Sequence, residues 1–96
     1  MGGKVKMERG SGNVFTDLGF SGPVAENLML RSKLMSEIRE VVRGTTQASA
    51  AKRFGISQPR LNDLLRGKID KFSLDALVNM LAAAGMRVEL RVKKVA

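Results

Sequence analysis

Basic side chains gather in the stretch 43–71, and their chemistry is the binding of anions. Seven Lys and Arg in this stretch face only two Asp, a net charge of +5 in a chain of 96 residues that carries +8. Residues 1–30 sum to zero, so the whole excess lies beyond residue 30. Such a cluster sets up a local positive field, and we expect a polyanionic partner. The seven bases are Arg43, Lys52, Arg53, Arg60, Arg66, Lys68 and Lys71.

The residue types that most enzymes and metal sites use are missing from the chain. It has no histidine and no cysteine, which removes the commonest general base, the commonest metal ligand and any disulfide. It also lacks the clustered carboxylates that metal-dependent nucleases need. The absence of Tyr and Trp, with only four Phe, argues against the stacking platforms of RNA-binding proteins. We therefore expect a binding protein, not an enzyme, with no metal or other cofactor.

The length predicts one domain with a modest hydrophobic core. No apolar run approaches the ~18–20 residues that span a membrane, and the N-terminus lacks the apolar stretch of a signal peptide. We expect a reduced, cytoplasmic protein without membrane contact. Residues 1–12 have no hydrophobic period and are predicted to be a flexible tail, so the folded domain comprises residues 13–96.

Helices must position the basic side chains. Capping residues and the spacing of hydrophobic residues together predict four helices. Thr46, Ser57 and Ser73 are the expected N-caps, because their hydroxyls can accept from free backbone N–H groups. In the longest helix, spacings of four, four and three place these residues on one face: Leu30, Leu34, Ile38 and Val41. The predicted helices extend over 22–44, 47–54, 57–66 and 73–85.

The sequence predicts extended chain at the two ends of the domain. Residues 13–20 hold four apolar residues between glycines, and we interpret them as a short strand or a docked extended segment. Residues 86–93 alternate apolar and charged side chains, which predicts a strand. Its unpaired edges need a partner, either Val14–Thr16 of the same chain or the same strand of a second copy. We favour the second copy, with three dimerisation residues: Val88, Leu90 and Val92.

Residues 47–66 read QASAAKRFGISQPRLNDLLR and resemble the helix-turn-helix of the Xre/phage-repressor family. Ala51 is small where two helices would cross, and Gly55 stands at the turn, where a left-handed backbone is cheap for glycine. The resemblance implies a mainly α, lambda-repressor-like domain of four to five helices with a C-terminal β-strand that pairs across a dimer. The expected buried positions of the motif are Ala50, Phe54, Ile56, Leu61 and Leu64.

This resemblance implies double-stranded DNA as the partner, with the helix 57–66 in the major groove. Gln58 and Asn62 can each bond an adenine edge in bidentate fashion, whereas Pro59 can only touch a thymine methyl. The expected base contacts are Ser57, Gln58, Pro59, Asn62 and Arg66. Phosphate contacts set register without reading sequence, and those expected are Thr46, Gln47, Lys52, Arg60, Lys68 and Lys71.

Two charged residues of the motif have ambiguous roles. Asp63 would repel phosphate unless it faces a cytosine or pairs with a lysine. Arg53 could point away from the DNA. Ser57 can act as an N-cap instead of a base contact, and it can also do both at once.

A wider resemblance, over about residues 13–93, is to the small bacterial Xre proteins of the HigA-type antitoxin group. Its more specific parts are Asn13–Phe20 and Phe72-Ser73-Leu74. It implies a homodimeric autorepressor of a palindromic operator, often paired with a RelE/HigB-like ribonuclease toxin. Two functions therefore stay open. One is a sequence-specific repressor, and the other is an antitoxin that binds a toxin protein through residues 13–20 and the first helix, with DNA binding secondary.

Overall fold

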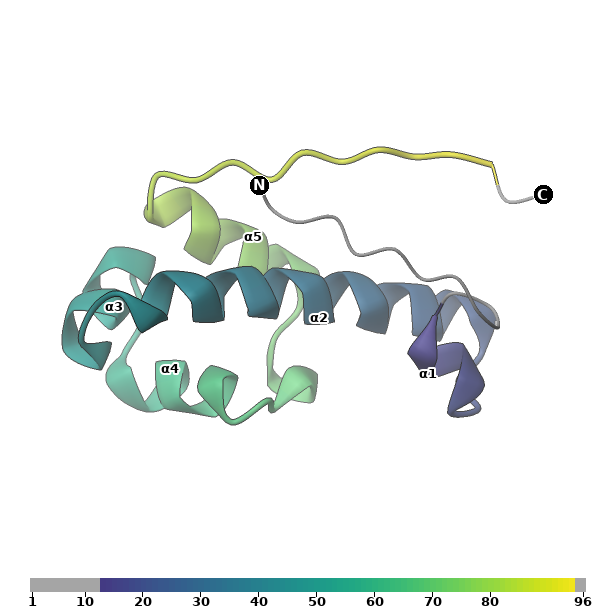
Figure 1. Cartoon of the computed structure of the whole chain (residues 1–96), viewed down its shortest axis with the longest axis horizontal. Coiled ribbons are helices and arrows are strands. Elements are labelled where there is room, and N and C mark those ends of the chain that lie inside the picture. Colours follow the sequence, from purple (N-terminus) through teal and green to yellow (C-terminus); the bar gives the residue numbers. More distant parts are fainter. Residues whose placement is uncertain (1–12, 95–96) are drawn as a thin grey trace.

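The computed structural model describes residues 13–94, so the predicted tail 1–12 lies outside the described residues. The long helix α2 runs through the middle of the domain, with α1 at its N-terminal end and α3 and α4 at its C-terminal end (Figure 1). This mainly helical architecture confirms the expected fold class as far as its helices are concerned. In chain order the described elements are α1 Val14–Asp17, α2 Gly22–Arg43, α3 Gln47–Phe54, α4 Gln58–Leu65, the 3-10 helix η1 Ile69–Lys71 and α5 Leu74–Ala83. None of these helices is long and apolar enough to cross a membrane.

The core forms where α3, α4 and α5 close on the C-terminal half of α2. Ile38 is fully buried there, as its place on the predicted face of α2 requires, but Leu30 is 41% exposed. Position along α2 is not the reason, because Ala25 and Leu28 precede Leu30 and are buried. The buried face is instead rotated around the helix from the predicted one. It uses Met35 and Val42, and the predicted Leu34 and Val41 are only partly buried. The buried cluster comprises Met35, Ile38, Val42, Ala50, Ala51, Phe54, Leu61, Leu64, Phe72, Leu77, Met80 and Leu81.

Helix α1 replaces the strand or extended segment expected over 13–20. Asn13 is only 5% exposed and caps this helix, because its Oδ1 accepts from the Phe15 N–H at 2.9 Å. Its Nδ2 donates to the Ala25 carbonyl at 3.0 Å, which ties α1 to the start of α2. The apolar pattern was too short to separate strand from helix, and the local cap decides the outcome. Val14–Thr16 is therefore helical and offers no strand edge.

Residues 86–94 follow α5 as a segment without strand pairing in the described chain. Val88 packs against the core, whereas Leu90 and Val92 are 76% and 92% exposed. The predicted C-terminal strand is thus not formed by the single chain, and the alternative of pairing with Val14–Thr16 is wrong, because that segment is helical. In Figure 1 this segment and α4 lie on opposite sides of α2.

Candidate nucleic-acid interface

Helices α3 and α4 are joined by a short turn whose geometry depends on local capping. The hydroxyl of Thr46 accepts from the Ser49 N–H at 3.1 Å and caps α3. Gly55 ends α3 in the left-handed region, with φ at 71°. The hydroxyl of Ser57 then accepts from the Arg60 N–H at 3.2 Å and starts α4. All three roles were expected from the sequence, and the structure confirms them.

Replacing Gly55 with alanine should destabilise the domain by about 1–2 kcal/mol, because an L side chain is strained in the left-handed region. An added Cβ would meet only the Ala83 Cβ at 3.9 Å, an ordinary contact. The loss is thus conformational rather than steric. Urea unfolding measures it, and Gly55→Asn should lose less because asparagine tolerates this conformation. An alanine variant as stable as the parent protein would contradict this view of the turn.

Three polar side chains form a stripe along α4 and its C-cap. Gln58, Asn62 and Arg66 follow one another at intervals of four residues, which places them on one side of a helix. All three are exposed, and their side chains make no hydrogen bond or ion pair within residues 13–94. The opposite side of α4 is fully buried through Leu61 and Leu64. The orientation of the polar stripe toward solvent is therefore fixed by packing.

The dimensions and the start of α4 suit a groove-binding helix. An α-helix with its side chains is about 10–12 Å in diameter, and the major groove of B-DNA is about 12 Å wide, so the eight-residue α4 can lie in it. Ser57 and Pro59 are exposed at its N-terminal end, the end that usually meets base edges. All five residues expected at the bases are thus exposed on α4 and its two caps.

The arginines of the domain divide into those that bond its own backbone and those that do not. Four guanidinium groups donate to carbonyl oxygens far along the chain, which uses donors that could otherwise bind an anion. Arg53 is one of them, and it points to the C-terminal end of α5 rather than along α4. These bonds join Arg31 to Ile69 and Phe72, Arg39 to Leu64, Arg53 to Ala84, and Arg60 to Lys71.

Arg60 has a structural position that the sequence did not indicate. Its guanidinium carbon lies 4.4 Å from the centre of the Phe72 ring, a cation–π contact, and its Nη2 donates to the Lys71 carbonyl at 3.3 Å. Arg31 donates to the Phe72 carbonyl from α2, at 3.3 Å. Together these contacts hold the stretch after α4 against the rest of the domain. The phosphate contact expected of Arg60 stays a prediction.

Asp63 clamps two of the lysines expected at phosphates. Its Oδ1 lies 3.4 Å from the Lys68 Nζ, and its Oδ2 lies 3.5 Å from the Lys71 Nζ. Partial desolvation acts to raise the pKa of Asp63, but hydrogen bonds and charge attraction from the two lysines outweigh it and hold that pKa below its usual value. The clamp is therefore complete above about pH 4, the usual pKa of aspartate, and weakens as the pH falls through the lowered pKa.

Replacing Asp63 with asparagine should raise the affinity for random duplex DNA by about 3- to 10-fold. Both lysines would be freed for phosphates, and the gain is modest because the ion pairs that DNA must break in the parent chain are exposed and therefore weak. The salt dependence of binding should become steeper by up to about two phosphate contacts. Asp70→Asn is the matched control, because Asp70 is exposed and has no ion pair in the described chain. An equal gain in both variants would show that only net charge matters.

The other expected contacts lie on separate elements. Thr46 and Gln47 are exposed at the N-terminal end of α3, and Lys52 is exposed on α3 without an ion pair within residues 13–94. The expected dimerisation residues Val88, Leu90 and Val92 lie on the C-terminal segment, across α2 from α4 (Figure 1). An interface on that segment would leave the polar stripe of α4 free.

Two short helices, α3 and α4, are joined by a turn with a left-handed glycine, and the second of them carries an exposed polar stripe. These features define a helix-turn-helix protein. The sequence profile of a family described as a helix-turn-helix domain matches residues 14–93, and the chain belongs to this family. Such a domain indicates a DNA-binding regulator. A comparison with curated proteins finds no match.

Proposed function

We propose that the protein is a sequence-specific repressor of the Xre/phage-repressor type, which binds a palindromic operator in its own promoter. The observation that carries this proposal is the exposed stripe of Gln58, Asn62 and Arg66 on a helix whose other side is buried. Amide and guanidinium groups are the side chains that read adenine and guanine edges in bidentate fashion. The protein acts in the cytoplasm by blocking the promoter, without catalysis and without a cofactor.

In the proposed complex, α4 enters the major groove with its N-terminal end at the bases. Gln58 and Asn62 bond adenine edges, and Arg66 bonds a guanine edge or an adjacent phosphate. Ser57 and Pro59, at the N-terminal end of α4, contact neighbouring bases. Affinity and its salt dependence come from the backbone contacts, which are Thr46, Gln47, Lys52, Arg60, Lys68 and Lys71.

The proposed repressor is a homodimer joined through residues 86–94. One α4 reads few base pairs, and helix-turn-helix proteins usually bind two half-sites about 34 Å apart. From Arg87 on, the C-terminal segment forms no backbone hydrogen bond within residues 13–94, and it has two exposed apolar side chains, Leu90 and Val92. Antiparallel pairing of two segments would satisfy both features with two-fold symmetry.

Selection of bound duplexes from a random DNA pool tests the proposal without knowledge of the operator. A dimeric repressor should enrich an inverted repeat whose half-sites lie about 10 base pairs apart, or a multiple of that spacing. A pool without any common sequence would contradict sequence-specific reading. A single half-site without symmetry would contradict the dimer alone.

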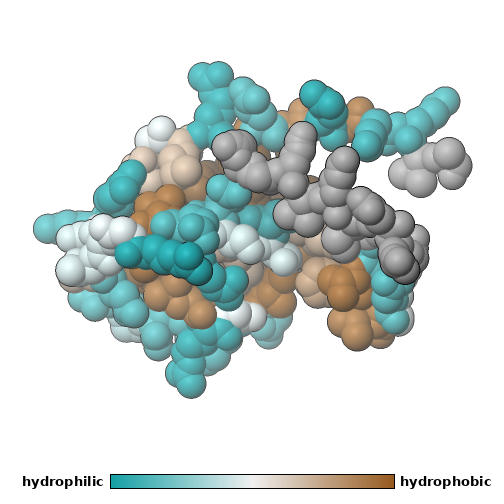
Figure 2. Space-filling model, in the orientation of Figure 1, coloured by the Kyte–Doolittle hydropathy of each residue, from teal (hydrophilic) through white to brown (hydrophobic). Residues whose placement is uncertain are grey.

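A second candidate function, antitoxin activity of the HigA type, is favoured by the apolar surface at the α1 end of the molecule. Leu18 is 69% exposed, and a group of brown apolar atoms lies at this end of the space-filling view in Figure 2. Contiguous apolar surface of this kind fits a protein partner better than DNA, and residues 1–30 carry no net charge. The side chains concerned are Val14, Leu18, Phe20 and Val24.

Co-expression with the product of the adjacent gene tests the antitoxin candidate. If that product is a RelE/HigB-like toxin, the parent chain should restore growth, and Leu18→Asp should fail to restore it while still binding DNA. Rescue by Leu18→Asp equal to that of the parent chain would remove the α1 surface from this role.

A further inference from the structure

We propose that two copies of the chain pair their segments 86–94 antiparallel, with Leu90 on the two-fold axis. The inference rests on the dimer in the proposed function and specifies its register. In this register Leu90 lies opposite itself, Val88 lies opposite Val92, and Glu89 of each copy lies opposite Arg91 of the other.

The backbone of the segment is open for pairing. Its last bond to the rest of the domain is from the Met86 N–H to the Leu81 carbonyl, at 2.9 Å. From Arg87 to Lys94 no backbone hydrogen bond is formed within the described chain. An unpaired row of donors and acceptors is a template for another strand, and the helical state of Val14–Thr16 removes the candidate from the same chain.

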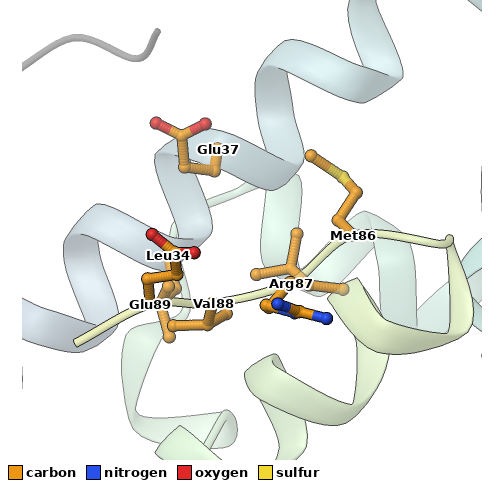
Figure 3. A pocket seen from close by; sticks show the side chains of 7 residues that line it. Leu34, Glu37, Met86, Arg87, Val88 and Glu89 are labelled. Atoms are coloured by element: carbon orange, nitrogen blue, oxygen red, sulfur yellow. The ribbon is translucent and has the colours of Figure 1, made fainter.

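The apolar side of the segment borders an open groove that is lined largely by apolar side chains. Six apolar side chains from α2, α5 and the segment line a hollow of about 450 Å³: Leu30, Leu34, Leu74, Val78, Val88 and Leu90. A neighbouring hollow of about 370 Å³ lies between Leu34 and Glu37 of α2 and the start of the segment (Figure 3). Val88 and Leu90 both border the larger hollow, so the apolar side of the segment faces it. Opposite residues of two paired strands share a face. A second copy would therefore also turn its apolar side chains toward the hollow.

Alternation along the segment restricts the register. Even-numbered residues from 86 to 92 are apolar, and odd-numbered residues from 87 to 93 are charged. Opposite residues share a face of a two-stranded sheet, so a shift by one residue would set charged side chains against apolar ones. The two-fold axis must therefore pass through a residue. A parallel arrangement would place Glu89 opposite Glu89 and Arg91 opposite Arg91, which like charges disfavour.

Charge complementarity and length then select Leu90. An axis at residue 89 or 91 sets a charge opposite itself, whereas an axis at Leu90 creates two Glu89–Arg91 pairs. Arg87 and Lys93 then face each other only at the solvent-exposed ends, where screening makes repulsion weak. An axis at Val88 would also pair opposite charges, Arg87 with Glu89. However, it would end the pairing at Leu90 and leave Val92, which is 92% exposed, without a partner.

Single cysteines distinguish these registers, because the chain contains no cysteine. Opposite Cα atoms in an antiparallel pair lie about 4.5–5.5 Å apart, within the range of a disulfide. Leu90→Cys should therefore form a covalent dimer under mild oxidation. Val88→Cys and Val92→Cys are the matched controls, since each would lie about 13 Å from its own copy. Cross-linking through residue 88 or 92, or no preference for residue 90, would overturn the register.

Mixing two charge variants gives an independent readout by native mass spectrometry. Glu89→Arg would place two arginines opposite each other in its homodimer, and Arg91→Glu would do the same with two glutamates. Their mixture should instead form the heterodimer, with opposite charges restored at both sites. A statistical 1:2:1 mixture, or monomers of the parent chain, would overturn the proposal. Sequence enrichment by the parent chain on random DNA would still report on DNA reading, so the two failures can be told apart.

Discussion

A Leu90→Asp variant should be monomeric and should bind the operator about 10²- to 10⁴-fold more weakly than the parent protein. Two carboxylates would lie opposite each other at the two-fold axis, in a place that otherwise holds two apolar side chains. A monomer binds one half-site, and it loses the gain of about 10² to 10⁴ that linked binding sites supply. Sedimentation gives the mass in solution, and titration of a labelled operator duplex gives the affinity.

Leu18→Asp is the matched control for this variant. It introduces the same charge at a side chain that is 69% exposed, close to the 76% of Leu90, but at the α1 end of the molecule. It should remain dimeric and bind the operator as the parent chain does. If Leu90→Asp stays dimeric, or if both variants weaken binding equally, the C-terminal segment does not join the two copies.

Replacing Gln58 with alanine should lower the affinity for the operator by about 10-fold or more and leave the affinity for random duplex unchanged. A bidentate contact to a base is worth about 1–3 kcal/mol of discrimination, and random DNA does not offer that contact. The truncation should not disturb the fold, because Gln58 is exposed and its side chain has no partner within residues 13–94. Competition titrations with the two duplexes measure the change in preference.

Lys52→Ala supplies the contrast for Gln58→Ala. Lys52 is free of ion pairs in the described chain, unlike Lys68 and Lys71, which Asp63 holds. Its loss should weaken binding to both duplexes alike and reduce the salt slope by about one contact. If Gln58→Ala also weakens both duplexes equally, Gln58 touches the backbone and does not read a base.

The helix-turn-helix could be predicted from the sequence because its signals are local. Thr46, Gly55 and Ser57 each act within a few residues, through a cap or a left-handed turn. The buried residues of α3 and α4 follow from the helical period and from the family resemblance. Helix α2 was also found from its ends, Pro23 and Gly44, although its buried face depends on which helices cover it.

Features that depend on distant contacts could not be predicted. The side chain of Asn13 accepts a hydrogen bond from the nearby Phe15 N–H, but it also donates one to the Ala25 carbonyl, 12 residues away. This second hydrogen bond fixes α1 on α2. Arg31 in mid-helix bonds carbonyls about 40 residues away, and no local pattern indicates that. The ion pairs of Asp63 could be predicted only in part. The sequence indicated that a lysine partner was one way to tolerate the charge of Asp63 near DNA, but it did not single out Lys68 and Lys71.

The C-terminal segment shows a limit of a different kind. Its alternation predicts a strand, yet a strand needs a neighbour, and the described chain provides none. The same residues can be an unpaired segment in one copy and a strand in two. A pattern in one sequence cannot by itself distinguish these states, because the second copy has the same sequence.

Sequence reading by α4 is tested by comparing the affinity for the operator found by selection with that for a random duplex of equal length, both at about 0.15 M salt. A protein that reads sequence through α4 should prefer the operator by about 10³-fold or more. Equal affinities for the two duplexes would contradict sequence reading by α4, because they would mean that the positive charge alone holds the DNA.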